Sequence, residues 1–239
     1  MLKLQIIDED EHYIFVNKPS GILTIPDRHD FQQTSVVTEL RKKHERIFII
    51  HRLDRDTSGC ICFAKTEQAH RYTSQLFEQR QVEKWYVGIV NGQIIPDKGL
   101  IDASIMEHPT LKGKMLIHQK QGKPSQTEYE VLESFGKYSF VKFKLLTGRT
   151  HQIRVHMKNI GHSLVCDEMY GEMNPIYISN LKKNYKQSKL AENESPILNR
   201  LALHAFQLKF VGESGHPYFI EASLPKDLDA TLKQCRKWL

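Results

Sequence analysis

Residues 51–59 form the densest group of side chains that could do chemistry. The segment reads His51-Arg52-Leu53-Asp54-Arg55-Asp56-Thr57-Ser58-Gly59 and lies between the apolar runs 47–50 and 60–64. A charged loop between two strands is a rigid platform, and its last three residues have the composition of a tight turn. Such a loop could present Asp54 as a nucleophilic or charge-stabilising carboxylate. On local composition alone, a surface network of ion pairs among Arg52, Asp54, Arg55 and Asp56 is the favoured interpretation.

A second polar cluster, residues 145–157, predicts a strand that passes through Gly148 into a helix. Thr150 is the expected N-cap. Spacings of three and four place one polar face and one core-facing face on this helix. The polar face comprises His151, Arg154 and Lys158, and the core-facing residues are Ile153, Met157 and Ile160. The polar face could bind an anion near the start of the helix, although a solvent-facing Arg154 is the simpler interpretation.

The elements that must position these clusters are short strands and a few helices. Strand-length apolar segments, rich in β-branched or aromatic residues, occur at 13–16, 47–50, 60–64, 85–90, 129–132, 138–146 and 201–210. Helical patterns occur at 35–43, 67–79, 151–160 and 227–239. Strands in runs without regular strand–helix alternation predict an α+β fold with a mainly antiparallel mixed sheet and flanking helices. No repeat or linker is evident, and we expect a single domain over 1–239.

The composition is that of a globular protein, with 40% hydrophobic and 26% charged residues. The net charge of +6 favours a phosphate-rich partner if the cations cluster. Two lysine-rich excursions, 108–123 and 173–196, are expected outside the core, with a solvated insertion as the alternative interpretation. No segment resembles a signal peptide or a membrane span.

The four cysteines contain no CxxC pair, and a strand would place Cys60 and Cys62 on one face. We therefore expect reduced structural thiols in a cytoplasmic protein, with zinc binding as the less favoured interpretation. The pair His151 and His156 lacks the one-turn spacing and the glutamate of a zinc helix, so no metal site is expected there.

Together the two clusters resemble the RluA-type pseudouridine synthases, the family that modifies uridines in ribosomal and transfer RNA. The resemblance is carried by the ordered patterns HRLDxxTSG, KxY, GRTHQIRVH and RLALHA, and by shorter segments at 17–21, 90–92, 122–130, 170–171 and 224–225. The chain departs from the family at Ser163, where proline is more usual, and at Cys166, where glycine is. The family often carries an N-terminal S4 domain. Here the catalytic region begins almost at once, so we expect a stand-alone catalytic domain that grips RNA itself.

The resemblance implies the roles of the site residues. Asp54 would be the catalytic carboxylate, Tyr86 the residue that packs against the target base, and Arg154 the partner of Asp54. An arginine favours the ionised carboxylate and can orient it bidentately. Arg52 would enter the RNA stack where the uridine leaves, because the base must be extruded before its glycosidic bond can be reached. The further RNA-binding residues would be His51, Arg55, Lys84, Arg149 and His151.

Further interpretations exist for three of these residues. A period-two pattern places Lys84, Tyr86 and Gly88 on one face of a strand, where a tyrosine is commonly part of the core. General-base help from Tyr86 is a further possibility. His51 could order the loop, and Lys84 could reach a phosphate.

The implied function is isomerisation of uridine to pseudouridine in a structured loop of ribosomal or transfer RNA, bound in a central cleft of a monomer without metal or other cofactor. The sequence leaves open whether Asp54 forms a covalent adduct or abstracts a ribose proton. One alternative is a non-catalytic RNA-binding or ribosome-assembly factor that retains the fold. Another is a carboxylate-dependent hydrolase, for which Asp56 is the nearby candidate for a second acid.

Overall fold

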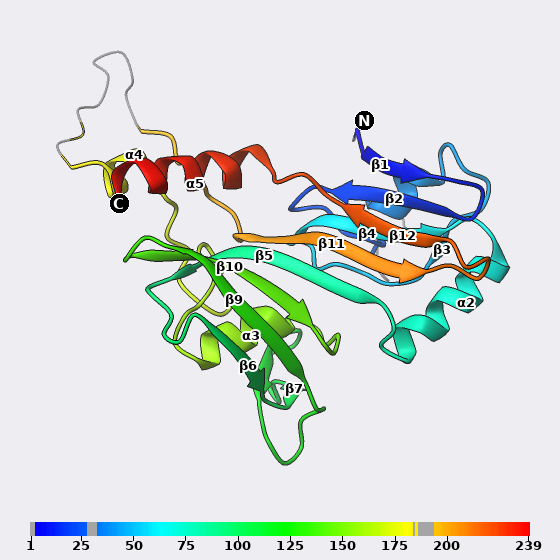
Figure 1. Cartoon of the computed structure of the whole chain (residues 1–239), viewed down its shortest axis with the longest axis horizontal. Coiled ribbons are helices and arrows are strands. Elements are labelled where there is room, and N and C mark those ends of the chain that lie inside the picture. The colour runs from blue at the N-terminus through cyan, green and yellow to red at the C-terminus, as the bar shows by residue number, and fades with distance from the viewer. Residues whose placement is uncertain (1–2, 28–32, 184, 186–193) are drawn as a thin grey trace. The chain divides into compact units, whose positions relative to one another are not determined.

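The computed structural model describes residues 3–27, 33–183, 185 and 194–239 (Figure 1). The chain divides into two compact units. Unit 1 comprises residues 1–86, 144–147 and 204–223, and unit 2 comprises 87–143, 148–203 and 224–239. The single domain over 1–239 and its central RNA-binding cleft stay predictions.

Unit 1 is built on a mixed, mainly antiparallel sheet. Its strands follow the order β1 (Gln5–Glu9), β2 (Tyr13–Lys18), β4 (Ser58–Ala64), β11 (Leu203–Val211) and the start of β5 (Glu83–Asn91). β3 (Phe48–Ile49) also pairs with β4, and β12 (Pro217–Glu221) pairs with β11. β2 is antiparallel to β1 and β4, whereas β11 runs parallel to β4.

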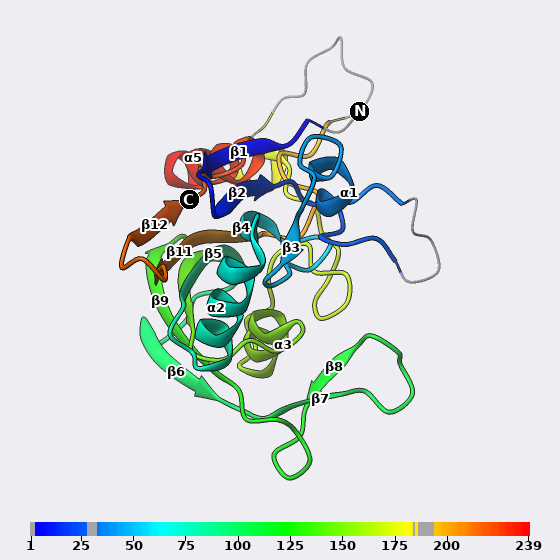
Figure 2. The same cartoon turned by 90° about the vertical axis from the view of Figure 1, so that its right-hand side faces the viewer.

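The sheet of unit 1 carries apolar side chains on both faces. Successive residues of β2 and β4 point to opposite faces, and both sets of side chains are buried. Tyr13, Phe15, Cys60 and Cys62 pack with α2 (Glu67–Glu78) on one face. The neighbouring residues of the same strands pack with α1 (Val36–Leu40) on the other, and Figure 2 shows both helices beside the strands. Cys60 and Cys62 therefore share a face, as predicted. All four cysteines are free and buried, and burial raises the pKa of Cys60 to about 12, so its thiol stays protonated.

Unit 2 contains a second group of neighbouring strands and the remaining helices. β5, β10 (Tyr138–Leu145), β9 (Gln126–Ser134) and β6 (Lys98–Asp102) follow one another in that order. β7 (Ile105–Glu107) and β8 (Met115–Ile117) form a separate antiparallel hairpin. α3 (Gln152–Asn159) packs against β8 and β9, and α4 (Ile178–Leu181) packs against α5 (Lys226–Trp238).

The α+β class with a mainly antiparallel mixed sheet is confirmed, and the predicted helices correspond to α1, α2, α3 and α5. The predicted strands omitted β1, β6 and β12, which bury few residues and so lack a strong apolar signal. The first basic excursion contains β8 and is a hairpin. In the second, Lys186 and Lys189 lie outside the described residues. In the part of the chain that the structure describes, every helix is too short or too polar to cross a membrane.

Two expectations about α3 were wrong. His151, not Thr150, is the N-cap, with φ of 55° and no side-chain capping bond. The residues from Gln152 to Met157 are all buried, Arg154 among them, so the helix has no solvent-facing polar side over this stretch. The polar side chains find partners in the interior: Gln152 Nε2 donates to Thr127 Oγ1 at 2.9 Å, and His156 Nδ1 lies 3.0 Å from the same oxygen. These polar side chains are therefore buried with internal hydrogen-bond partners instead of facing solvent.

Candidate active site

The loop that carries Asp54 is fixed by hydrogen bonds to the backbone on both sides of this residue. Before it, Leu53 N donates to Thr24 Oγ1 at 3.2 Å, and the Thr24 hydroxyl donates to Leu53 O at 2.9 Å. After it, Arg55 O accepts from Lys18 Nζ at 2.8 Å and from Gly21 N at 2.9 Å. The Asp54 side chain itself is partly exposed. Residues 18–24 therefore hold the carboxylate at a defined place at the surface of unit 1.

Lys18 is the buried cation in this arrangement, with a relative exposure of 0%. Its ammonium donates to Pro19 O at 3.0 Å, Ile22 O at 2.6 Å and Arg55 O at 2.8 Å. These bonds offset the cost of removing a charge from water. Sequence reasoning used the segment 17–21 only for its resemblance and missed this role. The available signal in the sequence was a lysine at the end of an apolar, strand-like segment.

Arg52 and Arg55 are both exposed. Arg55 Nε donates to Gly21 O at 3.1 Å, and neither arginine forms an ion pair with a described residue. The network of surface ion pairs that composition favoured is therefore not formed around them. The RNA contacts of both arginines stay predictions.

His51 orders the same loop from inside. Cys62 N donates to His51 Nε2 at 3.1 Å, and the imidazole stacks on Phe77 with ring centroids 4.8 Å apart. Burial, together with the positive charge of Lys84, lowers the pKa of His51 to about 3. A neutral, hydrogen-bonded ring supports the loop-ordering interpretation, and direct RNA binding by His51 stays a prediction.

Tyr86 lies close to Asp54 within unit 1. It is half-buried against the apolar cluster that contains Leu53 and Phe63. Burial, with a further effect of the negative charge of Asp54, raises the pKa of the Tyr86 phenol. The phenol therefore stays protonated, so it can stack on a base or donate a hydrogen bond but is poorly suited to act as a phenolate base.

The end of the Asp54 loop is locked to β11 by close backbone packing. Gly59 lies opposite Ala205 in the parallel pair and has φ of +116°, and a Cβ atom there would lie 2.2 Å from Ala205 O. Beside it, Ser58 Oγ is 3.0 Å from His204 Nδ1, and His204 Nε2 is 3.2 Å from Ala222 O. Since a carbonyl can only accept, Nε2 carries the proton and Nδ1 accepts from Ser58. Two segments of the family pattern thus meet in space.

Arg154 is anchored within unit 2 by a carboxylate that sequence reasoning did not single out. Its Nε and Nη2 donate to Asp167 Oδ2 and Oδ1, each at 2.8 Å, and both side chains are almost completely buried. Asp167 Oδ1 also accepts from Met169 N and Tyr170 N, and the guanidinium lies 5.0 Å from the Tyr170 ring centroid. The available signal in the sequence was the position of Asp167 directly after the apolar stretch 164–166. Asp54 and Arg154 belong to different units, so their pairing stays a prediction.

His151 and Arg149 flank the start of α3. Tyr170 OH accepts from Met115 N at 2.8 Å and forms a hydrogen bond of 2.8 Å with His151 Nδ1. Arg149 is half-buried, and its Nε has no hydrogen-bond partner among the described residues. Both are held by the protein scaffold, and their RNA contacts stay predictions.

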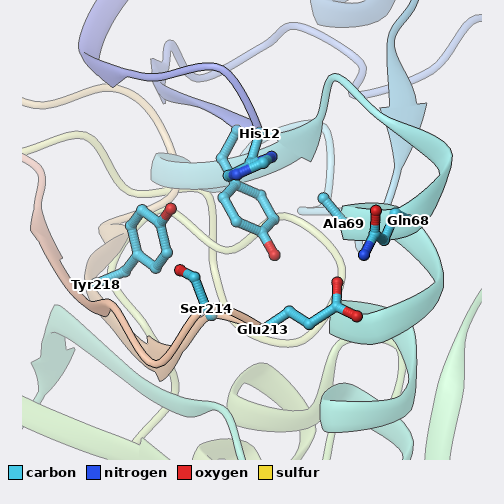
Figure 3. A pocket seen from close by; sticks show the side chains of 8 residues that line it. His12, Gln68, Ala69, Glu213, Ser214 and Tyr218 are labelled. Atoms are coloured by element: carbon cyan, nitrogen blue, oxygen red, sulfur yellow. The ribbon is translucent and has the colours of Figure 1, made fainter.

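Figure 3 shows a pocket in unit 1 that lies among His12, Gln68, Glu213 and Tyr218. Its remaining lining residues are Tyr13, Ala69, Gly212 and Ser214. The described lining includes no predicted site residue, so this pocket is not part of the candidate active site.

Comparison with known proteins identifies the family of the chain. A sequence model of the family described as RNA pseudouridylate synthase matches residues 12–159. The chain belongs to this family. It is 39% identical over 168 residues to the dual-specificity RNA pseudouridine synthase RluA of Escherichia coli, covering 70% of the chain and 77% of the relative. It is 35% identical over 241 residues to the ribosomal large subunit pseudouridine synthase D of Nitrosomonas europaea, covering 98% of the chain and 66% of the relative.

Solved pseudouridylate synthases share the fold. The human RNA pseudouridylate synthase domain containing 4 aligns with a TM-score of 0.73 and 25% identity, over 97% of this chain and 92% of that one. The human domain containing 1 aligns with a TM-score of 0.68 and 28% identity, over 98% and 95%. The predicted family, fold and enzyme class, an isomerase that makes pseudouridine in RNA, are confirmed.

One departure from the RluA-type pattern has a visible backbone consequence. Cys166 stands where the family more usually has glycine, and its φ of 56° lies in the left-handed region that favours glycine. Its buried Sγ lies 3.3 Å from Asn174 O. The cysteine therefore adopts a backbone conformation that favours glycine, and its side chain contacts the segment after Tyr170.

Proposed function

We propose that Asp54 catalyses the conversion of uridine into pseudouridine in structured RNA, in a cytoplasmic monomer that needs no cofactor. The observation that carries this proposal is the hydrogen-bonded Asp54 loop, whose Leu53 shares an apolar cluster with Tyr86. Fixing a reactive group in this way lowers the cost of reaching the reactive geometry.

In the proposed reaction the bond between uracil N1 and ribose C1′ breaks, the base rotates, and a bond between C5 and C1′ forms. C5 loses its proton and N1 gains one, so the atoms balance without an oxidant or a reductant. Asp54 assists the detachment, either as nucleophile or by taking a ribose proton. Tyr86 packs against the rotating base.

We also propose that Arg154 binds the Asp54 carboxylate. Asp167 takes the Nε–Nη2 edge of the guanidinium, and a planar guanidinium offers a second edge, Nη1–Nη2, to another carboxylate. Asp167 would then position Arg154 for this pairing.

The proposed substrate is a stem-loop of large-subunit ribosomal RNA, of transfer RNA, or of both, as the names of the relatives suggest. Exposed Arg52 would occupy the place of the extruded uridine. Lysines 112 and 114, in the segment between β7 and β8, would contact phosphates. The alternative, a non-catalytic RNA-binding or ribosome-assembly factor, predicts the same contacts without turnover.

The first prediction concerns Asp54 and is tested by release of tritium from RNA labelled at uracil C5. Asp54→Asn is expected to lower the release rate at least about 100-fold, because general acid–base groups contribute factors of this size or larger. Asp56→Asn is the matched control, since it removes the same charge from an exposed neighbour and should retain activity.

Unchanged release by Asp54→Asn would refute the role of Asp54. Absence of release by the parent protein from every RNA pool would favour the binding-factor alternative. Base-resolution pseudouridine mapping in a strain without the gene then identifies the uridine.

A further inference from the structure

An arginine occupies a backbone position at the end of α2 that normally requires glycine. Arg80 has φ of 60°. Arg80 N donates to Phe77 O at 3.2 Å, and Gln81 N donates to Leu76 O at 2.9 Å, which is the hydrogen-bond pattern of a Schellman motif. The left-handed residue of this motif is usually glycine because a Cβ atom is disfavoured there. Arg80 is exposed, so no buried contact accounts for its presence.

Lys84 lies near Arg80 and is half-buried at the start of β5. Its Nζ lies 5.5 Å from the centroid of the Phe77 ring. Arg80 borders the same residue, because its backbone N donates to Phe77 O at 3.2 Å. Burial, together with the positive charge of Arg80, lowers the pKa of Lys84.

No carboxylate among the described residues forms an ion pair with either cation. Glu83, the acidic neighbour in the sequence, instead lies 3.6 Å from Lys144 and 4.0 Å from Lys209. Two cations held together without a counter-charge favour an anionic ligand.

Phe77 connects this pair to the catalytic loop. Its ring stacks on His51, three residues before Asp54, and lies under Lys84, two residues before Tyr86. Two residues of an extended strand span about 7 Å, which is the scale of one nucleotide. An anion bound by Lys84 would therefore lie about one nucleotide from a base packed on Tyr86.

We propose that Arg80 and Lys84 together bind an RNA backbone phosphate next to the uridine that enters the site of Asp54 and Tyr86. This inference rests on the proposed function for the identity of the ligand. A phosphodiester fits because it is an anion present at every nucleotide, so the contact positions the RNA without reading its sequence. It also explains why an arginine is kept at the left-handed position, where glycine would serve the backbone better.

The test compares Arg80→Gly and Lys84→Met with the parent protein and with Arg71→Gln, which removes an exposed cation from the same helix. Binding of a fluorescein-labelled RNA hairpin with an unpaired uridine in its loop is measured by anisotropy over a series of salt concentrations. Each phosphate contact contributes about 0.7 on single strands, and about 0.9 on duplex DNA, to the slope of log affinity against log salt. We expect the slope to fall by about 1 in both site variants and to stay unchanged in the control.

Arg80→Gly also separates ligand binding from a structural role. Glycine suits the left-handed position, so the urea midpoint should equal or exceed that of the parent while RNA affinity falls. The proposal would be overturned if Arg80→Gly and Lys84→Met both had the same slope as the parent protein. A slope equal to that of the parent in Lys84→Arg, which keeps the charge, would support it.

Tritium release distinguishes the two proposals. A parent protein that releases tritium, together with variants of unchanged slope, would refute the phosphate site alone. Reduced slopes with no release by the parent would overturn the placement of the phosphate beside a reacting uridine.

Discussion

At the scale of single residues, His51 and Lys18 show two ways of holding one loop. His51 accepts a hydrogen bond from Cys62 N, and this requires an unprotonated Nε2. Lys18 donates to Ile22 O and to Arg55 O, which belong to two different loops, and its ammonium must carry its positive charge to do so. A histidine beside Asp54 was visible in the sequence, whereas the role of Lys18 was not, because its acceptors are backbone oxygens that only the fold brings near.

The pKa of His51 predicts a pH-dependent stability. Its folded-state pKa of about 3 lies below the ordinary value of 6.5, so the unfolded chain binds a proton first as the pH falls. The stabilisation is complete above pH 6.5 and is lost progressively between there and pH 3. Replacing His51 by Gln should therefore remove roughly 1–2 kcal/mol of the fall in unfolding free energy between about pH 7 and pH 5.

Urea unfolding of the parent and His51→Gln at these two pH values measures this difference. His216→Gln is the control, because it makes the same substitution at an exposed position. Equal pH dependence in the parent and in His51→Gln would contradict the neutral, buried imidazole.

At the scale of elements, the parallel pair of β4 and β11 explains why the Asp54 loop ends in glycine. Gly59→Ala would place a Cβ atom 2.2 Å from Ala205 O at a φ of +116°. We expect a loss of at least about 3 kcal/mol in unfolding free energy, since overpacking and an unfavourable φ each cost roughly 1–3 kcal/mol. Thermal or urea unfolding measures it.

Gly136→Ala separates the clash from the backbone strain. Gly136 has a positive φ of 73° but nothing within 4 Å of the added carbon, so its substitution should cost only about 1 kcal/mol. Similar losses at positions 59 and 136 would show that the contact with Ala205 does not constrain the loop.

The helix α3 shows where sequence patterns misled. Its three- and four-residue spacings predicted a polar face of His151, Arg154 and Lys158. Lys158 is exposed and His151 is half-buried, but Arg154 is buried, as are the polar residues Gln152 and His156. Periodicity assigns polar residues to solvent unless internal partners are known. Those partners, Thr127 and Asp167, are 25 and 13 residues away in the chain, so the local pattern could not reveal them.

At the scale of the whole molecule, the ordered series of motifs predicted the family and the fold class, which matches and structure confirm. The order of the motifs can be read from the sequence without knowing any distance between residues. The meeting of Ser58 and Gly59 with His204 and Ala205 is a property of the fold. The pairing of Asp54 with Arg154 is a stronger prediction of the same kind, because the two residues come from different units.

A double-mutant cycle tests that pairing. Asp54→Asn and Arg154→Met are made singly and together. The loss of the ion pair with Asp167 is common to both proteins that carry Arg154→Met, so it cancels in the cycle. A direct pair predicts a coupling of about 0.5–3 kcal/mol in the free energy of unfolding, whereas residues without shared partners are additive within about 0.5 kcal/mol. Asp56→Asn replaces Asp54→Asn in the control cycle. Additivity in the Asp54 cycle would mean that Arg154 pairs with Asp167 and not with Asp54.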